Sequence, residues 1–253
     1  MKIGLIVQPL IVIPARMAST RLPGKPLADI GGKPMIVRVC ERAEAANLGR
    51  VIVAAAEDEI ADAVMSAGYE VALTDPDLPS GSDRVHAAIS MIDSGGAFDT
   101  VINLQGDMPT LPPETLAAVL APLENPACDL ATLACEITDT AERSDPNVVK
   151  AVIAGDPSAT GQGQALYFTR AEAPAGDGPL WHHVGVYAWR RAALTRFVAA
   201  PPSPLERREK LEQLRALELG MRIDCAVIDG PPPNGVDTIE DLEAARAVFA
   251  GEG

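Results

Sequence analysis

Residues 11–27 read IVIPARMASTRLPGKPL, and the interpretation of the whole sequence starts from this stretch. A short run of β-branched residues ends at Pro14, and the loop that follows carries Arg16, Arg21 and Lys25 but no acidic side chain. This pattern is typical of a strand that leads into a cationic loop. Three positive charges among small residues suit a polyphosphate, because backbone N–H groups can then approach the phosphate oxygens closely.

The spacing of this loop excludes two common nucleotide motifs. It lacks the GxxxxGK[ST] pattern of a Walker P-loop, and the GxGxxG fingerprint of dinucleotide-binding folds is absent. A different kind of nucleotide loop is therefore indicated.

The charge of the chain narrows its partners. The 253 residues carry a formal net charge of −14, which disfavours nucleic acid and anionic membranes as partners. An anionic substrate must then be held by a local cationic patch. The apolar start, residues 1–9, is too short to span a membrane and is interpreted as an extension before the first core strand of a cytoplasmic protein. Four widely spaced cysteines favour reduced, buried thiols over disulfides or zinc.

The first half of the chain alternates strands with amphipathic helices. We expect a helix from Met35 that stops near Gly49, a helix at about 58–67, a helix after residue 84, and strands at 51–54, 70–74 and 100–104. Such alternation predicts an α/β fold with a mostly parallel sheet covered by helices on both faces.

Beyond residue 134 the pattern changes to shorter strands. We expect strands at 148–153, 165–168 and 184–189, loops at 154–164 and 173–180, helices at 190–200 and 205–219, and a last strand at 223–228 before a terminal helix. A Glu206–Lys210 pair would support the second of these helices. The strands indicate a smaller antiparallel insertion within one domain.

Two carboxylates are candidate Mg²⁺ ligands. Asp107 follows the strand at 100–104, and ligands bind at the carboxyl ends of strands in open α/β sheets. Thr238 and Asp241 can form a capping box for the terminal helix, which leaves the carboxylate of Asp237 available. Mg²⁺ prefers one or two carboxylates together with phosphates and waters. Asp237 could equally be structural when considered alone.

The segment Ser80-Gly81-Ser82-Asp83-Arg84 admits two interpretations. A serine or the aspartate could cap the following helix, which is the commoner role for such residues. Alternatively, Arg84 and the backbone at this helix start could hold the base and ribose of a nucleotide.

Several motifs together resemble the 3-deoxy-manno-octulosonate (Kdo) cytidylyltransferases from about residue 11 to residue 248. The opening loop and the Ser80–Arg84 segment are accompanied by further motifs in the same order: Gln105-Gly106-Asp107, Pro146-Asn147-x-Val-Lys150, Leu166-Tyr167-Phe168-x-Arg170, His183-x-Gly185-x-Tyr187, Ser203-Pro204-Leu205-Glu206, Leu211-Glu212-Gln213-Leu214-Arg215 and Gly235-Val236-Asp237-Thr238. The resemblance favours the nucleotide interpretation of Ser80–Arg84.

The resemblance implies an enzyme that activates Kdo with CTP for lipopolysaccharide synthesis, giving CMP-Kdo and pyrophosphate. It implies a three-layer nucleotidyltransferase fold with a mixed central sheet over residues 1–253. The nucleotide-binding part would be about 10–130 and 220–250, and a sugar-binding and dimerisation subdomain about 131–219. A cytoplasmic homodimer that uses Mg²⁺ is expected.

The resemblance also assigns roles to residues. Arg16, Lys25, Asp107 and Asp237 would be catalytic, with the two aspartates holding Mg²⁺. The nucleotide would meet Pro14, Ala15, Arg16, Arg21, Lys25, Ser80, Gly81, Arg84 and Asp107. The acidic sugar would meet Gln105, Arg170, His183, Gly185, Tyr187, Glu209 and Glu212. His183 could equally be a neutral, hydrogen-bonded strand residue without a catalytic task.

The sequence departs from the usual family pattern at Met108, at Leu78-Pro79, at His182 and at Ala55-Ala56. These departures leave both metal ligands in place but make the sugar contacts less certain. Two alternatives therefore stay open: a cytidylyltransferase for another acidic sugar, such as a sialic acid or amino-Kdo, and a non-catalytic nucleotide-binding relative.

Overall fold

The computed structural model describes residues 8–19, 21–230 and 235–251, so most of the predicted extension at 1–9 lies outside the described residues. The chain forms two compact units. Unit 1 comprises Met1–Leu116 with Pro233–Gly253, and unit 2 comprises Ala117–Pro232. The sequence predicted these borders near residues 131 and 219.

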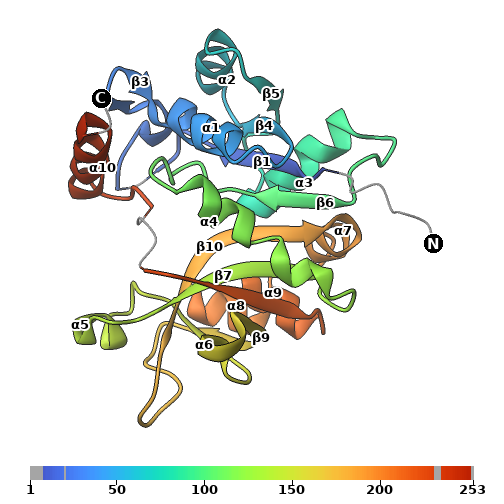
Figure 1. Cartoon of the computed structure of the whole chain (residues 1–253). Helices are drawn as coiled ribbons and strands as arrows, with labels where there is room; N and C mark the ends of the chain where they lie inside the picture. The colour runs from blue at the N-terminus through green and yellow to red at the C-terminus, as the bar shows by residue number, and fades with distance from the viewer. Residues whose placement is uncertain (1–7, 20, 231–234, 252–253) are drawn as a thin grey trace. The chain divides into compact units, whose positions relative to one another are not determined.

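Unit 1 is built on the predicted parallel strands. Its strands run in the order β5-β4-β1-β6, and every neighbouring pair is parallel. Their bounds are β1 Leu10–Ala15, β4 Arg50–Ala55, β5 Glu70–Leu73 and β6 Thr100–Asn103 (Figure 1). β1 is almost entirely buried, because a strand inside a covered parallel sheet meets side chains on both faces.

The helices of unit 1 follow the predicted pattern. They are α1 Met35–Ala45, α2 Asp58–Ser66, α3 Gly81–Ile92 and α10 Ile239–Gly251, with the hairpin β2 Asp29–Ile30 and β3 Lys33–Pro34. α1, α2 and α3 pack against the strands. Their buried stripes, such as Ile36, Val39 and Ala43 of α1, match the apolar spacing in the sequence. α4 is Pro113–Ala118, and the border between the two units falls within it.

Unit 2 carries a mixed sheet. Its strands run in the order β10-β7-β11-β9-β8; β7 and β11 are parallel, and the other pairs are antiparallel. The bounds are β7 Leu130–Glu136, β8 Lys150–Ile153, β9 Gln162–Thr169, β10 Trp181–Arg190 and β11 Ile223–Ile228. The predicted antiparallel strands are present, and β7 and β11 join them, which is why unit 2 begins earlier and ends later in the chain than the sequence suggested.

The other elements of unit 2 are short. They are η2 Ala121–Glu124, α5 Thr140–Ser144, α6 Pro157–Thr160, α7 Arg191–Val198, α8 Pro204–Glu209 and α9 Gln213–Glu218. The prediction of a loop over 154–164 was wrong in part, because α6 and the start of β9 lie there. Asp156 accepts from the N–H of Ala159 and so caps α6.

The single helix predicted over 205–219 is also wrong, because it breaks into α8 and α9 at Lys210. Lys210 has a left-handed backbone with φ 56°. The predicted Glu206–Lys210 pair does not form, since the carboxylate of Glu206 accepts from Arg215 Nε and Nη2 at 2.8 and 2.6 Å. Glu206 also closes a capping box with Ser203.

None of the helices in the described part of the chain has both the length and the apolar character that crossing a membrane requires.

Candidate functional site

The cationic loop begins where β1 ends and is held by its own backbone. Gly24 has φ 70°, a left-handed conformation that glycine adopts without strain, and it caps the short 3-10 helix η1 (Lys25–Leu27). The N–H of Met17 donates to Glu57 Oε2 at 2.9 Å. These contacts set the path of the loop and so the position of Lys25.

The turn after β6 lies directly against the end of β1. A Cβ added to Gly106 would stand 2.7 Å from the carbonyl oxygen of Pro14, so only glycine fits there. Asp107 follows immediately, at the carboxyl end of the parallel strands. This is the position that the sequence predicted for it.

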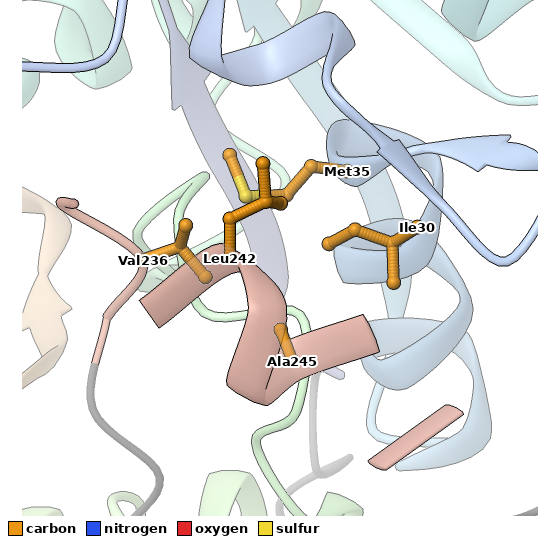
Figure 2. Close-up of a cluster of buried hydrophobic side chains, with 5 residues drawn as sticks. All are labelled: Ile30, Met35, Val236, Leu242 and Ala245. Atoms are coloured by element: carbon orange, nitrogen blue, oxygen red, sulfur yellow. The ribbon is translucent and has the colours of Figure 1, made fainter. Parts of the chain in front are cut away.

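The C-terminal segment reaches the same place through a small apolar cluster. Figure 2 shows Val236, Leu242 and Ala245 packed with Ile30 and Met35, and all five are buried. The N–H of Val236 donates to the carbonyl of Asp107 at 2.8 Å, which joins the two segments through their backbones.

The predicted capping box of α10 is present. The N–H of Asp241 donates to Thr238 Oγ1 at 3.2 Å, and Asp241 Oδ2 accepts from the N–H of Thr238 at 2.9 Å. The carboxylate of Asp237 therefore has no capping task and points to the cationic loop.

Lys25 bridges the two candidate metal ligands. Its Nζ donates to Asp107 Oδ2 at 2.7 Å and to Asp237 Oδ1 at 3.0 Å. Arg21 Nη2 donates to the other oxygen of Asp237 at 2.7 Å. Burial lowers the pKa of Lys25, but the two carboxylates outweigh it, so the pKa lies above its ordinary value and the side chain stays charged.

A pocket of about 380 Å³ opens beside this bridge, and its walls come entirely from unit 1. Its lining contains all nine residues predicted to meet the nucleotide, together with Asp237 and Gln105. The remaining lining residues are Ala18 and Ser19, which belong to the small residues of the predicted cationic loop, and Pro26, Leu78 and Gly106, which were not predicted as contacts. Small and apolar residues at a pocket wall give little signal in a sequence, because the same residues are common in ordinary turns.

Arg16 has a distinct status among the three loop cations. It is exposed at the pocket and forms no hydrogen bond or ion pair with the described residues. Its guanidinium can therefore meet a phosphate without first leaving a carboxylate, unlike Lys25 and Arg21.

Ser80 and Arg84 also do structural work at the pocket. Ser80 Oγ accepts from the N–H of Asp83 and caps α3, so the capping interpretation holds for this residue. Arg84 is buried and donates to Thr74 Oγ1 at 2.6 Å and to the carbonyl oxygens of Asp75 and Pro76. Burial lowers the pKa of Arg84. Its first task is to hold the 74–76 turn.

The donor set of the pocket fits Mg²⁺ only with help from a substrate. Two carboxylates, Asp107 and Asp237, converge on one point, occupied by an ammonium group. In the part of the chain that the structure describes, no group of three or more His, Cys, Asp or Glu side chains could hold a metal alone. Mg²⁺ commonly uses one or two carboxylates plus substrate phosphates, so the residues present suit an ion that binds with a polyphosphate.

The predicted sugar residues of unit 2 are tied to each other and to the backbone. Glu209 accepts from Thr169 Oγ1 at 2.9 Å and from the N–H of Arg170 at 3.1 Å. The guanidinium of Arg170 donates from Nε to the carbonyl of Glu209 and from Nη1 to the carbonyl of Pro146. Arg170 and Glu209 thus form one fixed assembly.

His183 supports the structural interpretation that the sequence left open. Its Nε2 lies 3.0 Å from Thr132 Oγ1, and its Nδ1 lies 3.4 Å from Gln213 Nε2. The Thr132 hydroxyl is also in range of two strand carbonyls, so His183 donates from Nε2 and accepts at Nδ1. Burial, with a contribution from His182, lowers the pKa of His183 to about 3, and the ring is neutral.

The remaining predicted sugar residues of unit 2 are Gly185, Tyr187 and Glu212. The pairing of β10 with β7 is irregular between Val184 and Tyr187, so Gly185 sits in a bulge. The ring of Tyr187 lies 5.7 Å from that of His183. Burial, and then Glu212, raises the pKa of Tyr187, which keeps the phenol neutral.

Lys150 has a structural role that the sequence did not predict. The side chain is completely buried, and its Nζ donates to the carbonyls of Asp145 and Val148 at 2.6 and 2.7 Å. Burial lowers the pKa of Lys150. The Pro146-Asn147-x-Val-Lys150 motif was visible in the sequence, but nothing in its pattern indicated that the ammonium group would donate to backbone carbonyls of the residues just before it.

The four cysteines are free and buried, as predicted. Burial is the main cause that raises their pKa values, for example to about 12 for Cys40. These thiols are therefore poor nucleophiles at neutral pH.

Comparison with known proteins gives consistent results. A family model described as cytidylyltransferase matches residues 10–223. The 3-deoxy-manno-octulosonate cytidylyltransferase of Azorhizobium caulinodans is 61% identical over 241 residues, which cover 95% of each chain. The protein of the same name from Rhodopseudomonas palustris strain HaA2 is 62% identical over 242 residues, 96% of this chain and 98% of its own.

Solved structures agree with the sequence relatives. A CMP:2-keto-3-deoxy-manno-octonic acid synthetase complexed with CTP aligns with a TM-score of 0.88 at 38% identity, covering 97% of this chain and 100% of its own. A 4-diphosphocytidyl-2C-methyl-D-erythritol synthase aligns with a TM-score of 0.66 at 18% identity over 97% of this chain and 100% of its own, which shows a shared fold.

Proposed function

Because the chain belongs to the 3-deoxy-manno-octulosonate cytidylyltransferase family, we propose that it transfers CMP from CTP to Kdo and releases pyrophosphate. The observation that carries the proposal is the pocket in which Lys25 joins Asp107 to Asp237 beside Arg16 and Arg21. This arrangement offers cations to a triphosphate and carboxylates to its metal ion.

The residues have separate tasks in this reaction. Arg16 and Lys25 bind the triphosphate of CTP, and the backbone at Ser80 and Gly81 meets the nucleoside. Asp107 and Asp237 hold Mg²⁺, which when bound neutralises negative charge on the phosphate oxygens as pyrophosphate leaves.

The chemistry is one displacement at phosphorus. The anomeric hydroxyl oxygen of the sugar forms a bond to the α-phosphorus of CTP, its proton is released, and the bond from that phosphorus to the pyrophosphate oxygen breaks. Such a step needs no covalent enzyme intermediate, so positioning and electrostatics supply the rate.

The acceptor is an acidic sugar held by unit 2. Arg170 offers a guanidinium to the sugar carboxylate, and Glu209, Glu212, Tyr187 and Gly185 offer acceptors and backbone to its hydroxyls. Gln105 lines the nucleotide pocket of unit 1, where it can meet CTP, and its role toward the sugar rests on the family resemblance. His183 stabilises β10, the strand that carries Gly185 and Tyr187.

The product serves lipopolysaccharide synthesis in the cytoplasm, where CTP is made, and the enzyme is a homodimer. The family resemblance is the support for the dimer. Uncovered strand edges add little to this proposal, because β8 pairs with both β9 and β10. Light scattering tests the dimer.

A pyrophosphate-release assay tests the activity. With CTP, Mg²⁺ and Kdo the protein should release pyrophosphate, and omission of Mg²⁺ or of the sugar should abolish it. Release with sialic acid or amino-Kdo but not with Kdo would assign another acceptor. Binding of CTP without release with any of these sugars would establish a non-catalytic relative.

A further inference from the structure

The bridge between Lys25 and the two aspartates does more than place three residues. One ammonium group contacts an oxygen of each carboxylate, at 2.7 and 3.0 Å, and the Lys25 side chain is only 14% exposed. Arg21 neutralises the second oxygen of Asp237. A Cβ on Gly235 would lie 3.3 Å from Asp107 Oδ1, so glycine at this position leaves that oxygen uncrowded. Each carboxylate thus already has a cationic partner in the protein alone.

The charges of this cluster favour a conditional metal site. The two positive charges of Lys25 and Arg21 balance the two negative charges of Asp107 and Asp237. A divalent cation that enters alone therefore meets a cluster with no net negative charge to attract it. It would also stand beside the nearby guanidinium of Arg16. Like charges repel each other strongly in a partly buried site. A triphosphate changes this balance, because it gives Lys25 and the arginines new anionic partners.

We propose that Lys25 is an internal counter-ion that fills the divalent cation site and leaves it when the triphosphate of the nucleotide accepts its ammonium group. The inference rests on the proposed function for the nature of the nucleotide, but its geometry stands on the bridge itself. Lys25 keeps Asp107 and Asp237 together in the free protein and excludes metal ions that arrive without nucleotide. Metal and nucleotide therefore bind cooperatively, each strengthening the other by the same factor.

The test measures metal binding without any sugar and without turnover. Mn²⁺ is titrated into the full-length protein, and the free ion is followed by electron paramagnetic resonance. Wild type should bind Mn²⁺ weakly alone and at least roughly tenfold more tightly with a non-hydrolysable CTP analogue, after the Mn²⁺ that the analogue binds in a protein-free sample is subtracted. Lys25→Met should bind Mn²⁺ alone at least roughly tenfold more tightly than wild type, because both carboxylates are then uncompensated.

Three variants make the result specific. Lys25→Arg keeps the positive charge and should stay as weak as wild type. Lys33→Met makes the same exchange at a lysine that pairs with Glu41 outside the pocket, and it should also match wild type. Adding Asp107→Asn to Lys25→Met should remove the gained affinity, which places the ion at these carboxylates.

Each contrary result overturns the proposal. Tight Mn²⁺ binding by wild type alone would show that Lys25 excludes nothing, as would an unchanged affinity in a folded Lys25→Met protein. If Lys25→Met does not fold by circular dichroism, the comparison of wild type with and without the CTP analogue decides alone, and equal affinities reject the proposal. A failed sugar assay would leave these binding results intact, so the two proposals fail separately.

Discussion

The pocket of unit 1 and the polar assembly around Glu209 in unit 2 contain the same kinds of side chains, but the two regions hold them differently. In the pocket, Lys25 pairs with Asp107 and Asp237 through side chains alone, and these carboxylates are 30% and 43% exposed. In unit 2, Arg170 and Lys150 donate to backbone carbonyls. Side-chain pairs can exchange partners when a substrate arrives, whereas bonds to the backbone fix the fold.

This difference separates two uses of charge in one protein. Partly exposed ion pairs contribute little to stability, because water competes for both partners. Buried groups that satisfy carbonyls are costly to remove, because the partners left behind stay unpaired. The pocket should therefore be sensitive in activity and tolerant in stability, whereas changes in the unit 2 assembly should also lower stability.

The largest effect is expected for Asp107→Asn. Loss of this carboxylate should lower kcat by roughly 10³-fold or more, because it removes a charge that acts on the metal and phosphates. The free energy of unfolding should change by less than about 1 kcal/mol, since the side chain is partly exposed. Pyrophosphate release and urea denaturation measure the two quantities.

A matched control lies at the opposite end of the same strand. Asp99 is exposed and directly precedes β6, so Asp99→Asn makes the same chemical change without touching the pocket. It should retain activity. A loss of several kcal/mol of stability in Asp107→Asn would instead make that residue a structural one and erase the contrast between the two regions.

A smaller effect, on acid stability, is expected from His183. The pKa of this buried ring falls from 6.5 to about 3 on folding, so the unfolded chain binds a proton that the folded chain does not. Its contribution to stability is complete above pH 6.5 and is lost as the pH falls toward 3. Within this window the loss approaches about 1.4 kcal/mol per pH unit.

The comparison with His183→Gln isolates this contribution. The variant should be less stable than wild type at pH 7, because it loses ring contacts with Phe168, but its stability should fall less steeply between pH 6 and pH 4. Urea denaturation at each pH gives both slopes, and the NMR signal of the wild-type ring should not titrate in this range. Parallel slopes would show that His183 is protonated in the fold and could serve the sugar.

The sequence predicted unit 1 more completely than unit 2 for a physical reason. Parallel strands and their helices leave strong local patterns, such as the buried run of β1 and the spacing of α1. The break between α8 and α9 leaves no such pattern. It depends on the partner chosen by Glu206, which is Arg215 and not Lys210. Glu206 and Arg215 are only nine positions apart and both lie inside the predicted helix, but helical periodicity gives a pair at this spacing no preference over a pair four positions apart.

The same reason applies to the pocket. The sequence identified Lys25, Asp107 and Asp237 as members of one site, because each stands beside a recognisable strand end or helix cap. It did not predict that Lys25 would bridge the two carboxylates. Asp107 lies 82 positions and Asp237 lies 212 positions from Lys25 along the chain, so the three residues meet only in the folded protein. Nor did the pattern around Arg84 reveal that its guanidinium is used on the 74–76 turn.

The smallest effect is expected where a remote side chain holds a pocket residue in place. The Phe249 ring of α10 faces the guanidinium groups of Arg38 and Arg42 at 4.5 and 4.9 Å and packs on the cluster that contains Val236. Phe249→Ala should reduce stability by about 1–2 kcal/mol through lost burial and cation–π contacts. Because α10 follows Asp237 directly, a loosened helix should also raise the Mg²⁺ concentration for half-maximal activity a few fold while kcat at saturating Mg²⁺ stays near wild type.

Val248→Ala, at an exposed neighbouring position on the same helix, is the matched control and should change neither quantity. An unchanged Mg²⁺ requirement in Phe249→Ala would show that the hydrogen bond from Val236 to Asp107 suffices to place Asp237, and that the pocket holds its carboxylates without help from the helix.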